Sequence, residues 1–166
     1  MRVHWRWTCS RRHHGVAALL ALALAACTRV GAPTLLALPP AAIDARQVAS
    51  NAGRTYQSDF TLEAAYPDDS AARHYAQQLP RPWLRCEGPG EWQRLEERGT
   101  TIHQQAHAWI NREARRTIVL VLRYVTEGGR VERPAYPIQH VVVTEHIGVD
   151  VDAPVSRLRL ACPPGR

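Results

Sequence analysis

The most regular hydrophobic pattern in the chain lies at residues 117–126, TIVLVLRYVT. Its side chains alternate with a period of two residues, which is the period of a β-strand. Both faces of this strand are apolar, because Ile118, Leu120 and Leu122 share one face while valines occupy the other. Apolar residues on both faces are typical of a strand at the centre of a sheet. We therefore expect a central strand here, with Leu120 in the core.

Weaker alternation predicts further strands on both sides of the central one. Residues 60–66 end at a proline, residues 138–149 are rich in valine, and residues 155–162 alternate leucine with arginine. In the last segment the alternation would direct Leu158, Leu160 and Cys162 towards the core. Three other segments are less regular: 82–86 is a short candidate strand, 91–98 fits either a strand or a helical turn, and 101–112 alternates weakly.

One segment has the spacing of an amphipathic helix. Ala71, Ala72, Tyr75 and Leu79 fall on one helical face, an aspartate at 68 or 69 supplies an N-cap, and Pro80 ends the helix. A helix of about ten residues is too short to be stable alone in water, so we expect it to pack on the central strand. Residues 41–53 predict a weak short helix or a continuation of a tether.

Together these elements predict an α+β fold. The expected architecture is a single domain with a mostly antiparallel sheet of about five to seven strands and one main helix packed on a face, because the elements do not alternate between helix and strand. We expect the folded domain at residues 54–166, a tether at residues 27–53, and a removable leader at residues 1–26.

The leader is recognised by its charge and its short apolar run. Residues 16–27 are apolar and end at Cys27, and the preceding residues carry Arg2, Arg6, Arg11 and Arg12 without an acidic residue. This is the pattern of a secretory signal peptide, whereas a membrane-spanning helix needs about 20 apolar residues. We therefore expect the leader to direct export and then to be removed.

Leu24-Ala25-Ala26-Cys27 resembles the lipobox of bacterial lipoproteins. The resemblance covers residues 1–27 and implies that Cys27 becomes the lipidated first residue of the mature chain. It also implies a location in the cell envelope. Thr28, in place of an aspartate at the second mature position, implies the outer membrane, with the domain facing the periplasm. The alternatives to a lipoprotein are an ordinary cleavable signal and a misassigned start in front of a cytosolic chain.

The charge of the mature chain argues against nucleic-acid binding. The full sequence has 21 basic and 15 acidic residues, and loss of the four leader arginines leaves 17 basic residues against the same 15 acidic ones. A net charge of about +2 lacks the basic excess of a nucleic-acid-binding domain. We therefore expect no nucleic-acid partner.

Two cysteines remain for the folded domain once Cys9 is removed and Cys27 is lipidated. Export to an oxidising compartment favours a disulfide between Cys86 and Cys162. Such a bond would hold the expected terminal strand near Trp83, with Cα atoms about 4.4 to 6.8 Å apart. Two free thiols or a redox pair are the alternatives, although the wide separation does not match a redox motif.

Histidines offer one route to a metal site. His103 and His107 lie four residues apart and His140 and His146 six apart, so on strands each pair would share a face. Pairing of the two strands could gather these imidazoles around a metal, but no cysteine or carboxylate stands beside them at a ligand-like spacing. Metal binding is therefore only an alternative, and no cofactor is expected.

Catalytic motifs are not apparent, whereas tryptophans suggest a binding surface. No serine lies in a nucleophile-elbow sequence, and no glycine-rich phosphate loop follows a strand. We therefore expect a non-enzymatic envelope lipoprotein that binds a protein partner or supports an envelope assembly. The candidate binding residues are Trp83, Trp92 and Trp109, and the alternative for each is a place in the core or at its rim. The alternative function is a small-ligand or metal-binding domain that uses the histidines or the tryptophans.

Overall fold

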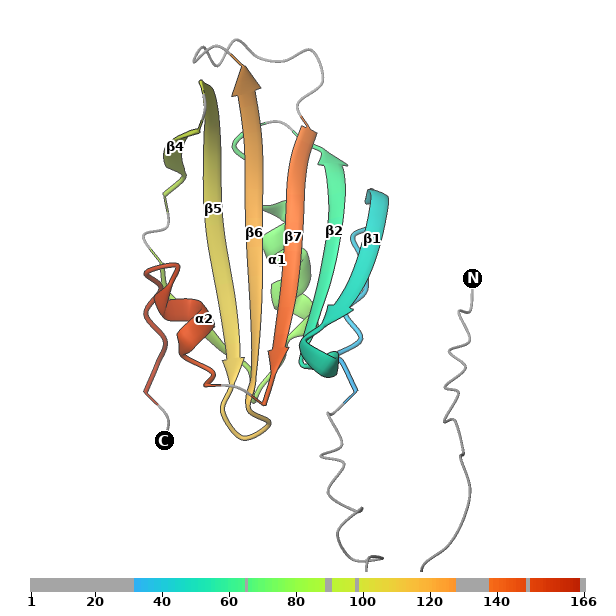
Figure 1. Ribbon diagram of the computed structural model, residues 1–166, viewed down its shortest axis with the longest axis vertical. Helices are drawn as coiled ribbons and strands as arrows, with labels where there is room; N and C mark the ends of the chain where they lie inside the picture. The colour runs from blue at the N-terminus through green and yellow to red at the C-terminus, as the bar shows by residue number, and fades with distance from the viewer. Residues whose placement is uncertain are drawn as a thin grey trace, which may run out of the picture.

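The computed structural model describes residues 32–64, 66–88, 91–97, 99–127, 138–148 and 150–164. The strands of this part of the chain form one antiparallel sheet in the order β1-β2-β7-β6-β5-β3, and β4 also pairs with β5 (Figure 1). The expected mostly antiparallel sheet with one main helix is confirmed. The elements are β1 (Ile43–Ser50), η1 (Asn51–Gly53), β2 (Thr55–Glu63), α1 (Ser70–Gln78), β3 (Leu84–Cys86), β4 (Gln93–Glu97), β5 (Thr100–Asn111), β6 (Arg116–Glu127), β7 (Ile138–Ile147) and α2 (Ala153–Ser156).

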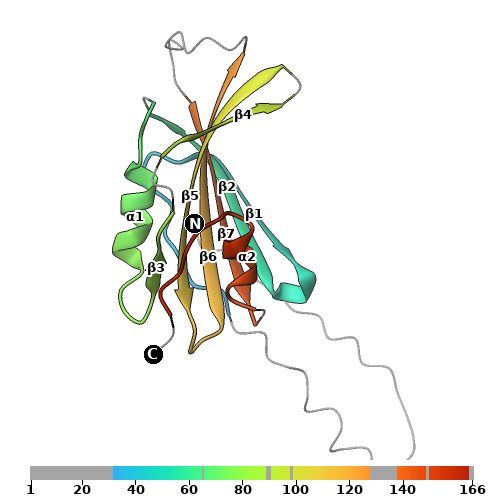
Figure 2. The same cartoon turned by 90° about the vertical axis from the view of Figure 1, so that its left-hand side faces the viewer.

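The helix α1 covers one face of the sheet, as Figure 2 shows. Its buried residues Ala71, Ala72 and Tyr75 join Leu120 of β6 in the larger of two core clusters. Leu120 is fully buried, which confirms the predicted central strand and its burial beneath the helix. Both faces of β6 are apolar because α1 packs on one of them and the C-terminal residues Val155 and Leu160 pack against Val119 on the other.

The C-terminal segment covers part of the opposite face (Figure 2). Val155 and Leu160 pack with Cys86 and Val119 in the second core cluster. The prediction of a strand at residues 155–162 is wrong, because the segment forms α2, a following turn and a single bridge between Ala161 and Glu87. Leucine and arginine alternate there because the turn, rather than a strand, places the leucines inwards.

Residues 43–50 also differ from expectation. They form β1, an edge strand that pairs with β2, so the weak helix or tether expected at residues 41–53 is wrong. All eight residues of β1 are exposed. An edge strand with no buried side chain leaves no hydrophobic period in the sequence, and only its backbone pairing defines it.

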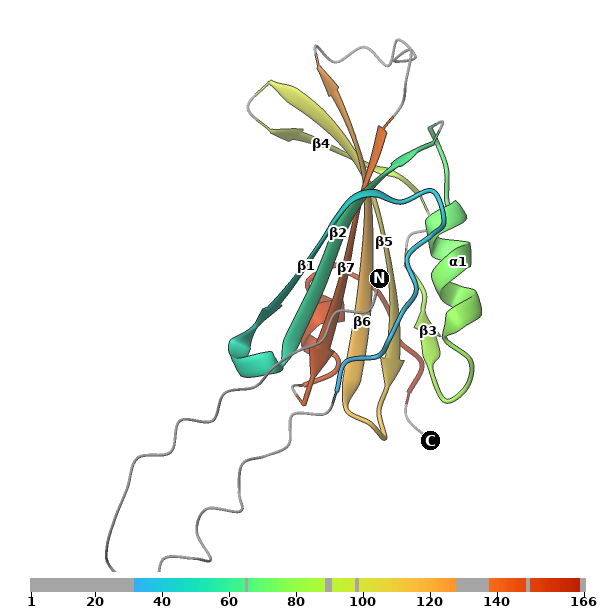
Figure 3. The ribbon, with the colours of Figure 1, turned by 90° about the vertical axis from the view of Figure 1, so that its right-hand side faces the viewer.

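The segment before β1 packs on the domain as well. Leu36, Leu38 and Ala42 lie against the larger core cluster, and the segment runs beside α1 in Figure 3. At its start, the backbone N–H and hydroxyl of Thr34 donate to the carboxylate of Glu145, at 2.7 Å each. The folded domain therefore begins well before the expected boundary at residue 54.

The remaining strands lie close to their predicted positions. Residues 91–98, which fitted a strand or a helical turn, contain β4, and residues 82–86 and 101–112 contain most of β3 and β5. The strand predicted at 60–66 begins earlier, at Thr55. The leader and Cys27 lie outside the described residues. Within the described ranges, no helix is both long enough and apolar enough to cross a membrane.

Candidate functional site

Among the residues that the structure describes, the C-terminal segment covers one end of the sheet face opposite α1 and leaves the rest of that face uncovered. Figure 1 shows this face towards the viewer, with α2 over its lower left part. Away from α2, side chains on this face are half-buried or exposed, including Val121 and Arg123 of β6 and His140 and Val142 of β7. We call this uncovered part the open face. It is a broad surface formed by paired and therefore rigid backbone.

Exposed aliphatic side chains cross the open face near the end remote from α2. Leu95 of β4 pairs with Ile102 of β5, and Ile102 pairs with Val125 of β6. The register that pairs Arg123 with His140 places Ile138 of β7 next in the row. Leu95, Val125 and Ile138 are 42%, 47% and 45% exposed. We call Leu95, Ile102, Val125 and Ile138 the aliphatic band. Exposed apolar residues that gather in this way mark interaction sites.

Beside the aliphatic band lies a polar cleft of about 450 Å³. One wall comes from β4 and β5 and the other from the turn after α2, and Leu95 belongs to both the cleft and the band. Three arginines line the cleft against one acidic residue. The charged and apolar lining includes Glu91, Arg94, Leu95, Arg157, Leu158 and Arg159.

The three arginines differ in their partners. Arg94 donates to the carboxylate of Glu96 at 2.8–2.9 Å, which lowers the pKa of Glu96. Arg157 and Arg159 are exposed, and neither forms an ion pair with any residue in the described ranges. Two guanidinium groups therefore remain available to an anion in the cleft.

The turn that carries these arginines ends α2 as a Schellman motif. Arg159 N–H donates to Ser156 O at 3.1 Å, and Leu160 N–H donates to Val155 O at 3.3 Å. Arg159 occupies the left-handed position of this motif, with φ of 56°. Glycine is the usual residue there, because a Cβ is disfavoured in this conformation. Val155 and Leu160 supply the apolar contact that accompanies the motif.

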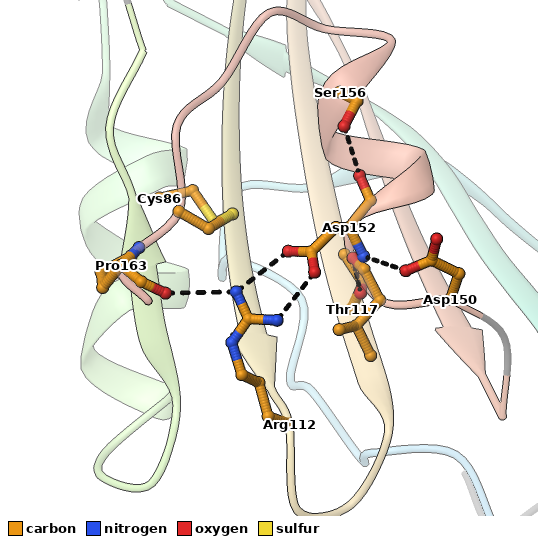
Figure 4. Close-up of a disulfide and its surroundings, with 9 residues drawn as sticks. Cys86, Arg112, Thr117, Asp150, Asp152, Ser156 and Pro163 are labelled. Atoms are coloured by element: carbon orange, nitrogen blue, oxygen red, sulfur yellow. Dashed lines mark hydrogen bonds and ion pairs between the residues drawn. A yellow bond between two sulfur atoms is a disulfide. The ribbon is translucent and has the colours of Figure 1, made fainter. Parts of the chain in front are cut away.

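One disulfide and three hydrogen bonds from Arg112 hold the C-terminal segment in place, as Figure 4 shows. The expected disulfide joins Cys86 and Cys162, with a Cα–Cα distance of 4.1 Å, slightly below the expected range. Arg112 donates two hydrogen bonds to the carboxylate of Asp152, at 2.8 and 3.0 Å, and a third to Pro163 O. These bonds lower the pKa of Asp152 and raise that of Arg112. The far wall of the cleft is therefore fixed to β3 and β5.

On the α1 face, aromatic rings gather near the same end of the sheet as the aliphatic band. The ring centroids of Tyr66, Trp92 and Tyr124 lie 5.2–5.4 Å from one another, and the ring of His103 lies 5.0 Å from that of Tyr66 in a tilted arrangement. Tyr124 accepts a hydrogen bond from Gln139 at 3.1 Å, and its burial raises its pKa to about 12. The aromatic cluster fills this end of the core between the sheet and the loops.

His107 lies deeper on the same face. It is 9% exposed, stacks on Trp109, and its Nδ1 lies 3.3 Å from a guanidinium nitrogen of Arg85. Burial, followed by the positive charge of Arg85, lowers the pKa of His107 to about 4. The ring is therefore neutral near pH 7, and Nδ1 accepts the hydrogen bond from Arg85.

The structure corrects the tryptophan-based binding surface. Trp109 is 2% exposed and belongs to the larger core cluster, so it cannot present a binding face. Trp83 and Trp92 are half-buried against the same cluster. The sequence shows no periodic signal around these tryptophans that separates core positions from surface positions.

The four histidines do not gather as the metal hypothesis requires. Each pair shares a face as predicted, but His103 and His107 of β5 face α1, whereas His140 and His146 of β7 lie on the opposite face. The strand β6 also separates β5 from β7. In the parts of the chain that the structure describes, no three potential ligands form a metal-binding group. These four histidines therefore do not support the alternative of a metal site.

Sequence reasoning missed both the aliphatic band and the cleft. The band requires the pairing of β4, β5, β6 and β7, which no single segment reveals. For the cleft, the strand expected at residues 155–162 directed Arg157 and Arg159 to solvent as an unremarkable polar face. Comparison with known proteins found no family model that matches the chain and no curated protein with significant similarity.

Proposed function

We propose that this chain is a lipid-anchored envelope protein whose non-enzymatic domain binds a protein partner through its open face. The aliphatic band is the observation that carries the proposal. Three of its four side chains are more than 40% exposed although they lie side by side on a rigid sheet. Burial of such a patch by a partner is favourable by about 25 cal/mol for each Å² of apolar surface removed from water.

The rest of the open face supports the same proposal. It carries threonine, glutamine and histidine side chains around the aliphatic band, including Gln104, His140 and Thr61. An apolar centre with a polar rim is the usual composition of a protein–protein interface. A small-molecule site, by contrast, is a concave and mostly apolar pocket, which the band does not form.

The anchoring part of the proposal rests on the lipobox resemblance at Cys27. Lipidation there would hold the domain on the periplasmic side of the outer membrane. The disulfide between Cys86 and Cys162 fits an oxidising compartment of this kind. The absence of enzymatic activity and of a nucleic-acid partner remain predictions from the sequence.

Site-specific photo-crosslinking in intact cells tests the proposed interface. A photoreactive amino acid at Val125 or Ile138 should give one discrete crosslinked species. Gln77, which is exposed on α1 on the other face, is the matched control position and should not give it. Leu95→Glu should remove the species, because a charge on the band opposes burial. An identical crosslinking pattern at Gln77 and Val125 would exclude the open face as the interface.

A further inference from the structure

We propose that the cleft between β4, β5 and the turn after α2 binds a carboxylate of an acidic segment in the protein partner. The cleft is continuous with the aliphatic band through Leu95. This inference rests on the proposed function, because it assigns a chemistry to the partner that covers the band.

The excess of positive charge in the cleft favours an anionic ligand. Arg157 and Arg159 have no ion-pair partner among the described residues, and both line the cleft. The positive charge of Arg157, after the effect of burial, lowers the pKa of the neighbouring His146. A guanidinium group binds a carboxylate with two parallel hydrogen bonds, a geometry that an ammonium group cannot provide.

The remaining lining favours a carboxylate on a peptide over a free phosphate. Glu91 lines the same cleft, and its negative charge opposes a doubly charged anion more than a singly charged one. Leu95 and Leu158 add apolar surface on which the side chains next to an acidic residue can pack. A volume of about 450 Å³ accommodates a few residues of an extended segment.

The conformation of Arg159 provides a clean test of the inference. Arg159 lines the cleft and holds the left-handed position of the Schellman motif, where glycine would avoid the steric cost of a Cβ. Glycine therefore suits the backbone, and Arg159→Gly removes the arginine side chain from the cleft without straining the turn.

Fluorescence anisotropy with the detergent-solubilised full-length protein tests the inference. The probe is a labelled peptide with two glutamates between leucines, and a peptide with glutamines in their place is its control. Arg159→Gly should weaken binding of the glutamate peptide about tenfold or more, the loss expected for a charged hydrogen-bonded pair. Its thermal unfolding midpoint should not fall, because glycine relieves the backbone.

Arg115→Gly is the matched control variant. Arg115 is also an exposed arginine at positive φ, 51°, but it lies in the turn between β5 and β6 and does not line the cleft. It should leave the affinity unchanged. Equal affinity for the glutamate and glutamine peptides, equal losses in both variants, or full competition by inorganic phosphate at the affinity of the peptide would each overturn the inference.

The two proposals can fail separately. Peptide binding that ignores Arg159→Gly, together with crosslinks confined to Val125 and Ile138, refutes the acidic segment and leaves the open-face interface intact. Peptide binding that depends on Arg159, together with crosslinks that are equal at Gln77 and Val125, refutes the interface and leaves an anion-binding cleft.

Discussion

Leu120 lies where the central strand meets α1, and its side chain is fully buried. Leu120→Ala removes apolar contacts and leaves a cavity that the rigid sheet cannot close. We expect the free energy of unfolding to fall by about 2 to 5 kcal/mol, as measured by chemical denaturation.

Val125→Ala on the same strand is the control for this measurement. Val125 is 47% exposed, so its replacement by alanine should lower the free energy of unfolding by less than about 1 kcal/mol. A loss at Leu120 as small as that at Val125 would contradict the packing of α1 on β6.

His107 gives the domain a defined response to acid. Its pKa is about 4 in the folded protein and near 6.5 when unfolded. Between pH 6.5 and pH 4 the unfolded chain binds more protons at this histidine than the folded chain does. The contribution of neutral His107 to the free energy of unfolding is therefore fully present above pH 6.5 and is lost as the pH falls towards 4. The difference between the two pKa values of His107 corresponds to about 3 kcal/mol in the free energy of unfolding.

The measurement is the free energy of unfolding as a function of pH, compared between the wild-type protein and His107→Phe. The phenylalanine keeps a ring against Trp109 but does not titrate. The variant should lose less stability than the wild type between pH 7 and pH 4. Parallel pH profiles would show that His107 does not retain its neutral form in the folded state.

Single residues also mark the limit of prediction from the sequence. The burial of Leu120 follows from its place in an uninterrupted alternation, and the disulfide follows from the count of cysteines in a chain that the sequence predicts to be exported. The burial of Trp109 and the left-handed conformation of Arg159 do not follow. The burial of Trp109 depends on the strands that pair around it, and the conformation of Arg159 depends on the turn after α2. A glycine at a helix end would have indicated such a turn, but an arginine does not.

At the scale of elements, the C-terminal segment is attached to the sheet rather than part of it. The disulfide closes a loop across a sequence separation of 76 residues. Loss of this crosslink in the double variant Cys86→Ala/Cys162→Ala should lower the free energy of unfolding by up to about 4 to 5 kcal/mol in the chain-entropy model.

Limited proteolysis can place this effect within the fold. The larger core cluster contains neither cysteine, so cleavage should begin in residues 150–164 while the strands β5, β6 and β7 stay protected. Arg112→Met, which removes the ion pair with Asp152 and keeps the disulfide, is the comparison. Unchanged cleavage after loss of the disulfide would mean that the polar contacts alone hold the segment.

Helices and strands could be predicted where the regular spacing of hydrophobic residues reflects which side chains are buried. The strands β6 and β7 and the helix α1 bury one or both faces, and each leaves its period in the sequence. The edge strand β1 buries no side chain, so its pairing leaves no trace in the pattern. The segment at residues 155–162 shows the opposite error, since a tight turn produced the alternation of a strand.

At the scale of the whole molecule, the proposed anchor is Cys27. Cys27→Ser should release the protein from membrane fractions or leave it unprocessed, because serine cannot form the thioether that carries the lipid. Fractionation followed by immunoblotting checks this. A variant that fractionates and migrates like the wild type would place the anchor elsewhere in the chain.

The contact between Thr34 and Glu145 sets how the domain would stand on a membrane. Only four residues lie between Cys27 and residue 32, so the five steps of chain reach at most about 18 Å. Arg116 of β6 donates to the same glutamate, so the chain enters the domain at the end of the sheet where β6 begins (Figure 3). A lipid on Cys27 would hold that end near the headgroups.

The aliphatic band lies at the other end of β6, whose 12 residues span about 40 Å. With the tether at the opposite end, the aliphatic band would lie at the end of the domain farther from the lipid anchor. A partner that covers the band would then need a contact region that projects away from the membrane surface.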